Sequence, residues 1–134
     1  MEIAFGKKVT GSEKSDDHPI FKETLRQLQT YFSDPSTTFS LPLELTGTEF
    51  CRRVWQSSTD IPFGQTRSYG ELARALDTGP RAVAAGCRSN HWPIIIPCHR
   101  VVAIRNLGGY CGQLSGPLIE IKRWLLKHEG CAID

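Results

Sequence analysis

The sequence lacks several features that would assign it to an easily recognised class of protein. Its five cysteines are odd in number and form no Cys-x-x-Cys pair, which argues against a disulfide framework and against a zinc finger. It contains no run of eighteen apolar residues, and its first residues lack the layout of a signal peptide. We therefore expect a cytoplasmic protein in a reducing compartment, with no membrane contact, no bound metal and no cofactor.

Acidic side chains are missing from one long segment. Between Thr78 and Ile119 the chain has no aspartate or glutamate, although arginines are frequent there. The net charge of the whole chain is only +2 and its pI is near 8.3, so the total alone does not indicate a nucleic-acid binder. The local excess of positive charge nevertheless favours a polyanionic partner. The arginines of this segment are Arg81, Arg88, Arg100 and Arg105.

The length limits the number of domains. A chain of 134 residues with 40% hydrophobic content can bury one good core and a small appendage, but not two full-sized domains. Residues 1–38 begin with an alternating, strand-like pattern at Ile3 and Phe5, and helical spacing follows from Pro19 to about Phe32. We expect an extended linker over residues 39–45, and a main domain over residues 46–134.

Two capping pairs and a proline predict helix starts in the main domain. Thr46 with Glu49 predicts a helix to about residue 57, and Ser68 with Glu71 predicts a second over residues 69–76. Pro80 suits the first position of a third helix, which would run over residues 81–87. A glycine turn joins the last two helices, so the pair has the pattern of a helix-turn-helix. Such a pattern alone is more often a packing device than a DNA-binding site.

A final helix is predicted to begin at Pro117. Gly130 suits the position just after its C-terminus, which places Glu129 in the last turn. A carboxylate there opposes the helix dipole unless a partner compensates it, and the alternative is a solvated end residue. The residues expected on the buried face are Leu118, Ile121, Leu125 and His128, with Trp124 beside them.

The stretch with the strongest chemical signal is residues 94–102, in which three isoleucines precede Pro-Cys-His-Arg-Val-Val. The apolar run suits a backbone buried on both sides, and Pro97 ends it and presents Cys98 at one place. His99 and Arg100 are a base and a cation that would favour the thiolate. On an extended backbone, His99 would reach Cys98 only through a bend or a bridging water. An isolated Cys-His pair is more often structural than catalytic, so both interpretations stay open on the pair alone.

The wider sequence around this motif resembles one family. Pro-Cys-His-Arg-Val, with Asn90 upstream and residues 122–130 (Lys-Arg-Trp-Leu-Leu-Lys-His-Glu-Gly) downstream, resembles the O6-alkylguanine-DNA alkyltransferases, or methylated-DNA-protein-cysteine methyltransferases. The resemblance runs from about Tyr31 to Gly130. It implies an α+β fold with a mainly helical C-terminal domain, a winged helix-turn-helix and a buried active site. A reduced ribonuclease-H-like α/β piece would precede that domain.

The resemblance also implies a reaction and a partner. Such a protein would act as a monomer, bind double-stranded DNA through the minor groove, and flip O6-methylguanine out of the duplex, with O4-methylthymine as an alternative substrate. It would then move the alkyl group irreversibly onto Cys98, once per protein molecule. His99 would act as a base through a water, and Glu129 would orient His99.

Further residues receive roles from the same resemblance. On the second helix of the helix-turn-helix, Arg81 would fill the gap left by the flipped base, Ala82 would approach the groove, and Arg88 would contact a phosphate. Asn90 would hold this helix against the Cys98 segment. The glycine-rich loop 106–116 would close on the guanine. The residues that would contact the base are Tyr69, Val101, Tyr110, Cys111 and Gly112.

Two other function classes fit parts of the sequence. A cysteine hydrolase would also use Cys98, His99 and Glu129, but it would turn over many times and would need an oxyanion hole. A DNA-binding module without chemistry would use only Arg81 and its helix. Alkyltransferase-like proteins of that kind lack the acceptor cysteine, whereas Cys98 is present here. A reaction that ends after one methyl group per protein would exclude the hydrolase.

Overall fold

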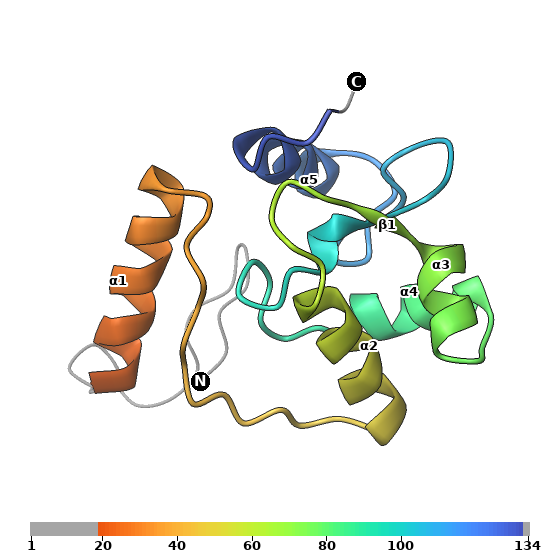
Figure 1. The fold of residues 1–134 in the computed structure, drawn as a ribbon, viewed down its shortest axis with the longest axis horizontal. Coiled ribbons are helices and arrows are strands. Elements are labelled where there is room, and N and C mark those ends of the chain that lie inside the picture. Colours follow the sequence, from red (N-terminus) through yellow and green to blue (C-terminus); the bar gives the residue numbers. More distant parts are fainter. Residues whose placement is uncertain (1–18, 133–134) are drawn as a thin grey trace. The chain divides into compact units, whose positions relative to one another are not determined.

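The computed structural model describes residues 19–132, and the chain divides between Glu44 and Leu45 into two compact units (Figure 1). The strand expected at Ile3 and Phe5 lies outside the described residues. Within residues 19–132, no helix is both long enough and apolar enough to cross a membrane. Each unit is described by itself.

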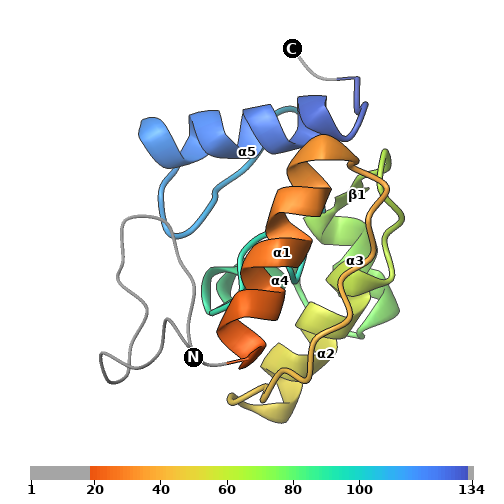
Figure 2. The ribbon, with the colours of Figure 1, turned by 90° about the vertical axis from the view of Figure 1, so that its left-hand side faces the viewer.

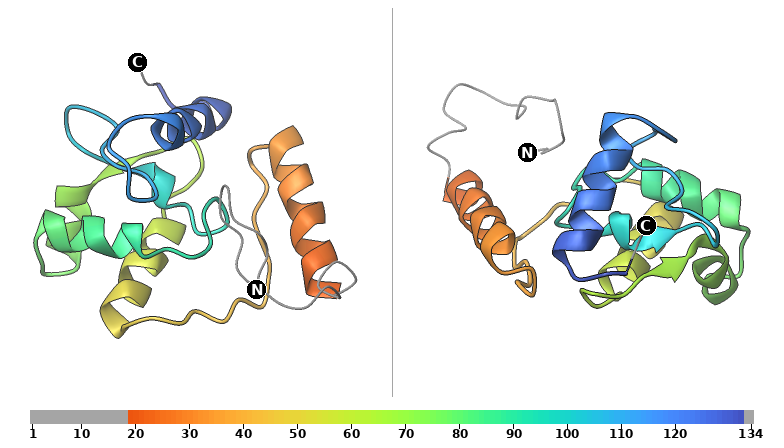
Figure 3. Two further views of the ribbon diagram at one scale, coloured as in Figure 1. Left: turned by 180° about the vertical axis from the view of Figure 1, so that it is seen from behind. Right: turned by 90° about the horizontal axis from the view of Figure 1, so that it is seen from above.

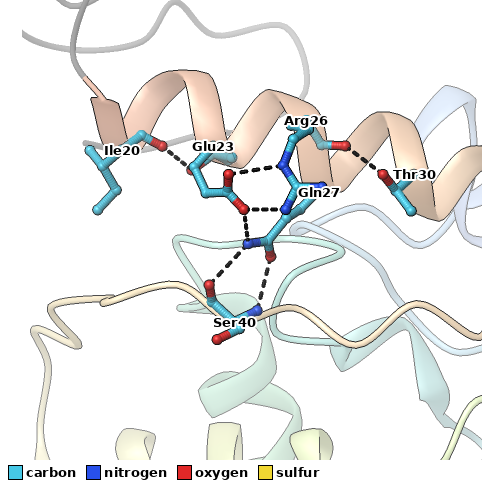
Figure 4. A network of polar contacts seen from close by, with 7 residues as sticks. Ile20, Glu23, Arg26, Gln27, Thr30 and Ser40 are labelled. Atoms are coloured by element: carbon cyan, nitrogen blue, oxygen red, sulfur yellow. Dashed lines mark hydrogen bonds and ion pairs between the residues drawn. The ribbon is translucent and has the colours of Figure 1, made fainter.

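The first unit consists of helix α1 (Pro19–Ser33) and the segment that follows it. The helix has the extent that its apolar spacing predicted. Gln27 fastens the segment to the helix, since its side-chain amide donates to the Ser40 carbonyl at 3.0 Å and accepts from the Ser40 backbone N–H at 2.9 Å (Figure 4). The rings of Tyr31 and Phe39 lie 5.7 Å apart and join the same two segments. The segment after α1 is therefore held by specific contacts.

The second unit has four α-helices among the described residues, arranged around one short turn. That turn is the 3-10 helix η2 (Cys98–Arg100), which contacts α2 and α5. Figures 1 and 2 both show α5 on one side of the unit and helices α2 to α4 on the other. The remaining elements are α2 (Glu49–Thr59), β1 (Arg67–Ser68), α3 (Tyr69–Ala75), α4 (Pro80–Arg88), β2 (Val101–Val102) and α5 (Pro117–His128).

The cap of α3 was predicted correctly, and that of α2 was not. The Ser68 hydroxyl accepts from the Glu71 backbone N–H at 3.0 Å, and the Glu71 carboxylate accepts from the Ser68 N–H, which completes the capping box of α3. On α2 the cap is Thr48 instead of Thr46. Its hydroxyl accepts from the Cys51 N–H at 3.1 Å, and its extended backbone suits an N-cap. Two threonines close together made the register ambiguous in the sequence.

A parallel pair of strands connects α3 to the Cys98 turn. Arg67 pairs with Val101 and Ser68 pairs with Val102, so β1 ends where α3 begins and β2 begins where η2 ends. The pairing places the start of α3, with Tyr69, beside the segment that carries Cys98. It brings together two parts of the chain that are far apart in the sequence.

Helices α2 and α4 meet closely at Gly86. A Cβ atom at this position would lie 2.9 Å from Cγ2 of Val54, which is closer than side chains tolerate. The indole N–H of Trp55 donates to the Gly86 carbonyl at 2.9 Å, and both Val54 and Trp55 are buried. This contact sets the distance between α2 and α4.

The isoleucine run is buried as predicted, but its backbone is not extended. Ile94 has a φ of 75°, and the Ile96 N–H donates to the Trp92 carbonyl at 2.8 Å, so the chain turns here. All three isoleucines are nevertheless buried. An apolar run indicates burial more directly than it indicates backbone conformation, because a turn satisfied by its own hydrogen bonds can be buried as well as a strand.

The buried face of α5 also differs from the expected one. Trp124 is 50% exposed and stacks on His128 at 4.7 Å between ring centroids. Of the four residues expected on the buried face, only Leu125 is buried, and the helix points Lys122 inward. The buried positions are Ile119, Lys122, Leu125 and Leu126.

Candidate functional site

Cys98 is the first residue of the η2 turn and is only 5% exposed. Its backbone N–H donates to the Ile96 carbonyl at 2.8 Å, which fixes the turn. Its Sγ atom lies 3.4 Å from Oγ of Ser58, a buried residue of α2. The backbone bends here into a tight turn, which is one of the two arrangements that the sequence left open for Cys98 and His99. The thiol instead faces α2 and the end of α4.

The surroundings of Cys98 favour its thiolate. A hydrogen bond with the Cys87 side chain lowers the pKa of Cys98 most strongly, and Ser58, Asn90 and the charge of Lys122 act in the same direction against the effect of burial. The same hydrogen bond, together with burial, raises the pKa of Cys87. Cys98 is therefore the more acidic thiol of this pair, and Cys87 is the hydrogen-bond donor to it.

The cation beside the thiol is Lys122, and this corrects the expectation for Arg100. The Lys122 side chain is 0% exposed, and its Nζ atom donates to the carbonyls of Val101 at 2.7 Å and Gly109 at 2.9 Å. Nζ also lies 5.8 Å from the centre of the Tyr69 ring. Burial lowers the pKa of Lys122 to about 8, so the group is still largely charged at neutral pH.

Arg100 belongs to a buried network around Glu129. Its Nε donates to Oε1 of Glu129 at 2.8 Å, its Nη2 donates to Oε2 at 3.2 Å, and its Nη1 donates to the Ile61 carbonyl at 2.6 Å. Glu129 is the C-cap of α5, where a carboxylate is unfavourable unless it is paired. The two-point contact with Arg100 compensates it. Removing one member of such a buried pair costs about 3–5 kcal/mol.

His99 is fully buried and neutral. Its Nε2 lies 2.7 Å from Oε2 of Glu129, and burial lowers the pKa of the imidazole more than this carboxylate raises it. Because the ionised carboxylate only accepts, the proton of the neutral ring belongs on Nε2, and Nδ1 is the basic nitrogen. Among the residues that the structure describes, Nδ1 has no hydrogen-bond partner.

A cavity of about 350 Å³ opens beside Cys98. Its walls come from α3, α4, the Cys98 turn and the loop between β2 and α5. The left view of Figure 3 shows the backbone of this unit from behind. A volume of this size suits a small ligand. The lining residues are Tyr69, Ala84, Cys87, Arg88, Asn90, Pro93, Cys98, Gly108, Gly109, Tyr110, Cys111, Gly112, Gln113 and Leu114.

Four of the five residues expected to contact a base line this cavity, namely Tyr69, Tyr110, Cys111 and Gly112. The Tyr69 hydroxyl lies 3.4 Å from the Gly109 carbonyl, and burial raises its pKa to about 12, so it remains a donor. The fifth residue, Val101, is buried outside the lining, and its carbonyl accepts from Lys122.

The residues expected to contact DNA lie on α4. Arg81 is exposed and Ala82 is partly exposed at the start of the helix. Arg88, at its end, is exposed but also lines the cavity, where its Cδ atom would lie 3.7 Å from a Cβ at Gly112. Asn90 donates to the Ile96 carbonyl at 2.9 Å and accepts from the Trp92 N–H at 2.7 Å, which fastens the end of α4 to the Cys98 segment.

Sequence reasoning did not identify Ser58, Cys87 or Lys122 as site residues. Cys87 lies on the helix expected to contact DNA and Lys122 begins the stretch 122–130, but neither residue itself received a role in the site from the sequence. The one available signal was for Cys87, which precedes Asn90 on the segment of α4 expected to approach Cys98. Their roles follow from tertiary packing, which the sequence did not resolve.

Comparisons with known proteins agree with this geometry. Residues 49–131 match the family described as 6-O-methylguanine DNA methyltransferase, DNA binding domain. The methylated-DNA-protein-cysteine methyltransferase of Archaeoglobus fulgidus is 41% identical over 111 residues, which is 81% of this chain and 74% of the relative. A crystal structure of the Mycobacterium tuberculosis O6-methylguanine methyltransferase aligns with a TM-score of 0.70 at 40% identity, over 81% of this chain and 65% of that one. The same organism's OGT in complex with DNA aligns with a TM-score of 0.69 at 39% identity, over 82% and 66%.

Proposed function

The chain belongs to the family of methylated-DNA-protein-cysteine methyltransferases, DNA-repair proteins that transfer an alkyl group to a cysteine, and we propose that Cys98 is the acceptor in this protein. The observation that carries the proposal is a buried cysteine with a lowered pKa on the wall of a cavity large enough for a purine. A thiolate held in this way is a soft nucleophile suited to an alkyl carbon. The substrate is duplex DNA that contains O6-methylguanine, with O4-methylthymine as an alternative.

The chemical step is a single displacement. Sγ of Cys98 attacks the methyl carbon, the carbon–O6 bond breaks, and the guanine leaves as a neutral base once it has gained a proton. The Nδ1 atom of His99 removes the thiol proton through a water, while Glu129 keeps the ring in the required tautomer. The product is a thioether, which has no leaving group that would regenerate the thiol. The reaction therefore ends after one turnover.

The cavity supplies the groups that hold the base. The Tyr69 hydroxyl donates to the leaving guanine, and the Cys111 backbone N–H faces O6, with Tyr110 and Gly112 forming the adjoining wall. The Cys98 and Val101 carbonyls take the exocyclic amine. Extruding a base costs a few kcal/mol and costs least for a poorly paired base, which favours damaged guanine without any readout of sequence.

DNA binding is assigned to α4 as the second helix of a winged helix-turn-helix. Arg81 fills the space vacated by the flipped base, Ala82 allows close approach in the minor groove, and Arg88 contacts a phosphate. Asn90 transmits the position of α4 to the Cys98 segment. An exposed arginine on a helix with small side chains supports this assignment.

The remaining parts of the proposal concern organisation. We infer an N-terminal piece that ends at residue 38, a linker over residues 39–45, and a DNA-binding and acceptor domain from residue 46. The protein works as a monomer in the cytoplasm, without cofactor or metal. The support for these inferences is the family relationship.

Intact-mass spectrometry after incubation with a duplex that contains O6-methylguanine tests this function. We expect the protein to gain one methyl group, mapped to Cys98, with no further turnover. The Cys98→Ala variant should gain none yet bind the duplex nearly as well, because phosphate and groove contacts supply most of the affinity. Cys51→Ser, which removes a cysteine on α2 outside the cavity lining, is the matched control and should react like the wild type. Release of many product molecules per protein would instead indicate a hydrolase.

A further inference from the structure

We propose that Cys87 and Cys98 form a reversible disulfide when the protein meets a hydroperoxide, with Cys98 as the thiol that is oxidised and Cys87 as the resolving thiol. The bond itself requires only these two side chains. Its consequence for repair rests on the proposed function, because a disulfide at Cys98 removes the acceptor.

The position of the two cysteines carries this inference. Both line the same cavity, Cys87 from the last turn of α4 and Cys98 from the η2 turn. A short chain of hydrogen bonds fixes their backbones to each other. The Asn90 N–H donates to the Cys87 carbonyl at 3.1 Å, its side chain donates to the Ile96 carbonyl at 2.9 Å, and that carbonyl also accepts from the Cys98 N–H at 2.8 Å. A chain of three hydrogen bonds that passes through Asn90 thus joins the two backbones, and the two cysteine side chains hydrogen-bond one another.

The two thiols differ in the way that this reaction needs. Cys98 has the lowered pKa and is the nucleophile, whereas Cys87 remains protonated beside it. Cys111 lines the cavity too, but it is exposed, on the facing loop. A redox-sensitive cysteine is typically a thiolate with a second thiol close enough to resolve its oxidised form.

The proposed step has two stages, and both balance. The Cys98 thiolate attacks the terminal oxygen of the hydroperoxide, the O–O bond breaks, and a sulfenic acid forms. The hydroxide or alkoxide that leaves takes a proton from solvent to become water or an alcohol. Sγ of Cys87 then attacks the sulfenic sulfur. The S–O bond breaks, and the leaving hydroxide takes the Cys87 proton to form water. Cys98 loses its negative charge in the first stage. Cys87 then no longer donates a hydrogen bond to a thiolate, and no negative charge beside it opposes its ionisation.

The disulfide would protect a residue that can react only once. Without a resolving thiol, the sulfenic acid proceeds to sulfinic and sulfonic acids, which ordinary thiols do not reduce. With Cys87 beside it, a small dithiol can restore both thiols by exchange. The oxidised protein cannot accept an alkyl group at Cys98, and reduction restores this activity.

The test is peroxide treatment of the full chain, followed by intact-mass measurement and peptide mapping without reductant. We expect the wild type to lose two hydrogen atoms and to yield a crosslinked peptide that joins Cys87 to Cys98. Methyl acceptance should fall by the oxidised fraction and return after dithiothreitol. In Cys87→Ser, the crosslink should be missing and Cys98 should reach the sulfinic or sulfonic state, so dithiothreitol should restore little of the loss. Each variant is compared with its own untreated activity.

Cys111→Ser serves as the matched control, since it removes another cysteine that lines the same cavity. It should still form the crosslink between Cys87 and Cys98. A crosslink of Cys98 to Cys111, or oxygen addition at Cys98 in the wild type without any crosslink, would overturn the proposal. Mapping the wild type needs no variant to fold and no methyl transfer. If the protein forms this disulfide but accepts no methyl group, the proposed function is wrong, whereas the inference about the disulfide still holds.

Discussion

The ammonium group of Lys122 lies 2.7 Å from the carbonyl oxygen of Val101 and 2.9 Å from that of Gly109. Val101 directly follows the Cys98 turn, and Gly109 belongs to the loop that forms the opposite wall of the cavity. A single buried cation from α5 therefore joins both walls. The same charge helps to lower the pKa of Cys98, so one side chain affects the shape of the cavity and the state of its nucleophile.

Lys122→Met should slow alkyl transfer from both duplex DNA and free O6-benzylguanine. The methionine fills similar volume but leaves two carbonyls without their donor, at a cost of about 1–3 kcal/mol each, and it removes a charge that favours the thiolate. We expect the single-turnover rate at pH 7 to fall by about tenfold or more, because losing the nearby positive charge raises the pKa of Cys98 and leaves less thiolate. Lys127→Met, an exposed lysine of the same helix, is the control and should leave both rates unchanged.

Cys87→Ala should shift the pH dependence of alkyl transfer upward. The lowered pKa of Cys98 means that the reactive thiolate persists below the usual range and is lost as pH falls through that lowered value. Without the Cys87 donor, the inflection in the plot of rate against pH should move to higher pH. Below the inflection, the rate should fall by about tenfold for each pH unit. Single-turnover rates with O6-benzylguanine between pH 5 and about 9 measure this.

Cys87→Ser is the matched comparison for that profile, because its hydroxyl can still donate to the thiolate. Its inflection should lie close to that of the wild type. If the alanine variant also kept the wild-type inflection, Ser58 and Lys122 would be sufficient to set the pKa of Cys98. Ser58 has a single hydroxyl proton, which it can give either to the Val54 carbonyl at 3.1 Å or to Cys98 Sγ at 3.4 Å.

Arg81→Ala should slow repair in duplex DNA far more than reaction with the free base. Only the duplex has a stack that must be filled after the base leaves, and Arg81 is exposed on α4 away from the cavity lining. We expect a loss of at least about tenfold for the duplex and less than about twofold for free O6-benzylguanine. Arg81→Lys keeps the charge without the planar group, so recovery of duplex repair in that variant would assign Arg81 to phosphate attraction alone.

Methylation of Cys98 should destabilise the protein. The added methyl enters a site where Sγ already lies 3.4 Å from Ser58, and overpacking by one such group costs about 1–3 kcal/mol. A loss of 1 kcal/mol lowers Tm by about 4–8 °C in a domain of this size. Thermal melts of methylated and unmodified protein in one buffer measure the shift, and hydrogen exchange should show the region of Asn90 loosening first. Cys98→Ala treated with the same DNA should show no shift, whereas an unchanged Tm in the methylated wild type would mean that the cavity accepts the group without strain.

The sequence indicated those parts of the site that lie within short motifs. Cys98, His99 and Asn90 are close together in the chain. The capping box at Ser68 specifies a helix start through local hydrogen bonds, and Pro80 does so through its fixed φ. The pairing of Glu129 with His99 followed from the family resemblance and from the need to compensate a carboxylate at a helix C-terminus.

What the sequence could not supply are contacts that depend on how helices rotate. No pattern in the sequence predicted that Lys122 would be buried, since a lysine is rarely buried, and its inward position is stabilised by two carbonyls that accept hydrogen bonds from its ammonium group. Arg100 was expected beside the thiol because it is near Cys98 in sequence, yet the turn directs it to Glu129. The neighbours of a buried group are set by packing, which no local pattern records.

The close contact of α2 and α4 at Gly86 has a consequence for which mutations this protein can tolerate. Every single-base change that replaces glycine introduces a Cβ atom, and here that atom would meet Val54 at 2.9 Å. Glycine in a helix is otherwise worse than alanine by about 0.5–1 kcal/mol, so a change to alanine would ordinarily be neutral or beneficial. At this codon the usual gain is reversed, because the helix that bears Arg81, Cys87 and Arg88 would be pushed away from the helix that bears Ser58. Any substitution of Gly86 should therefore destabilise the protein unless a smaller residue first replaces Val54.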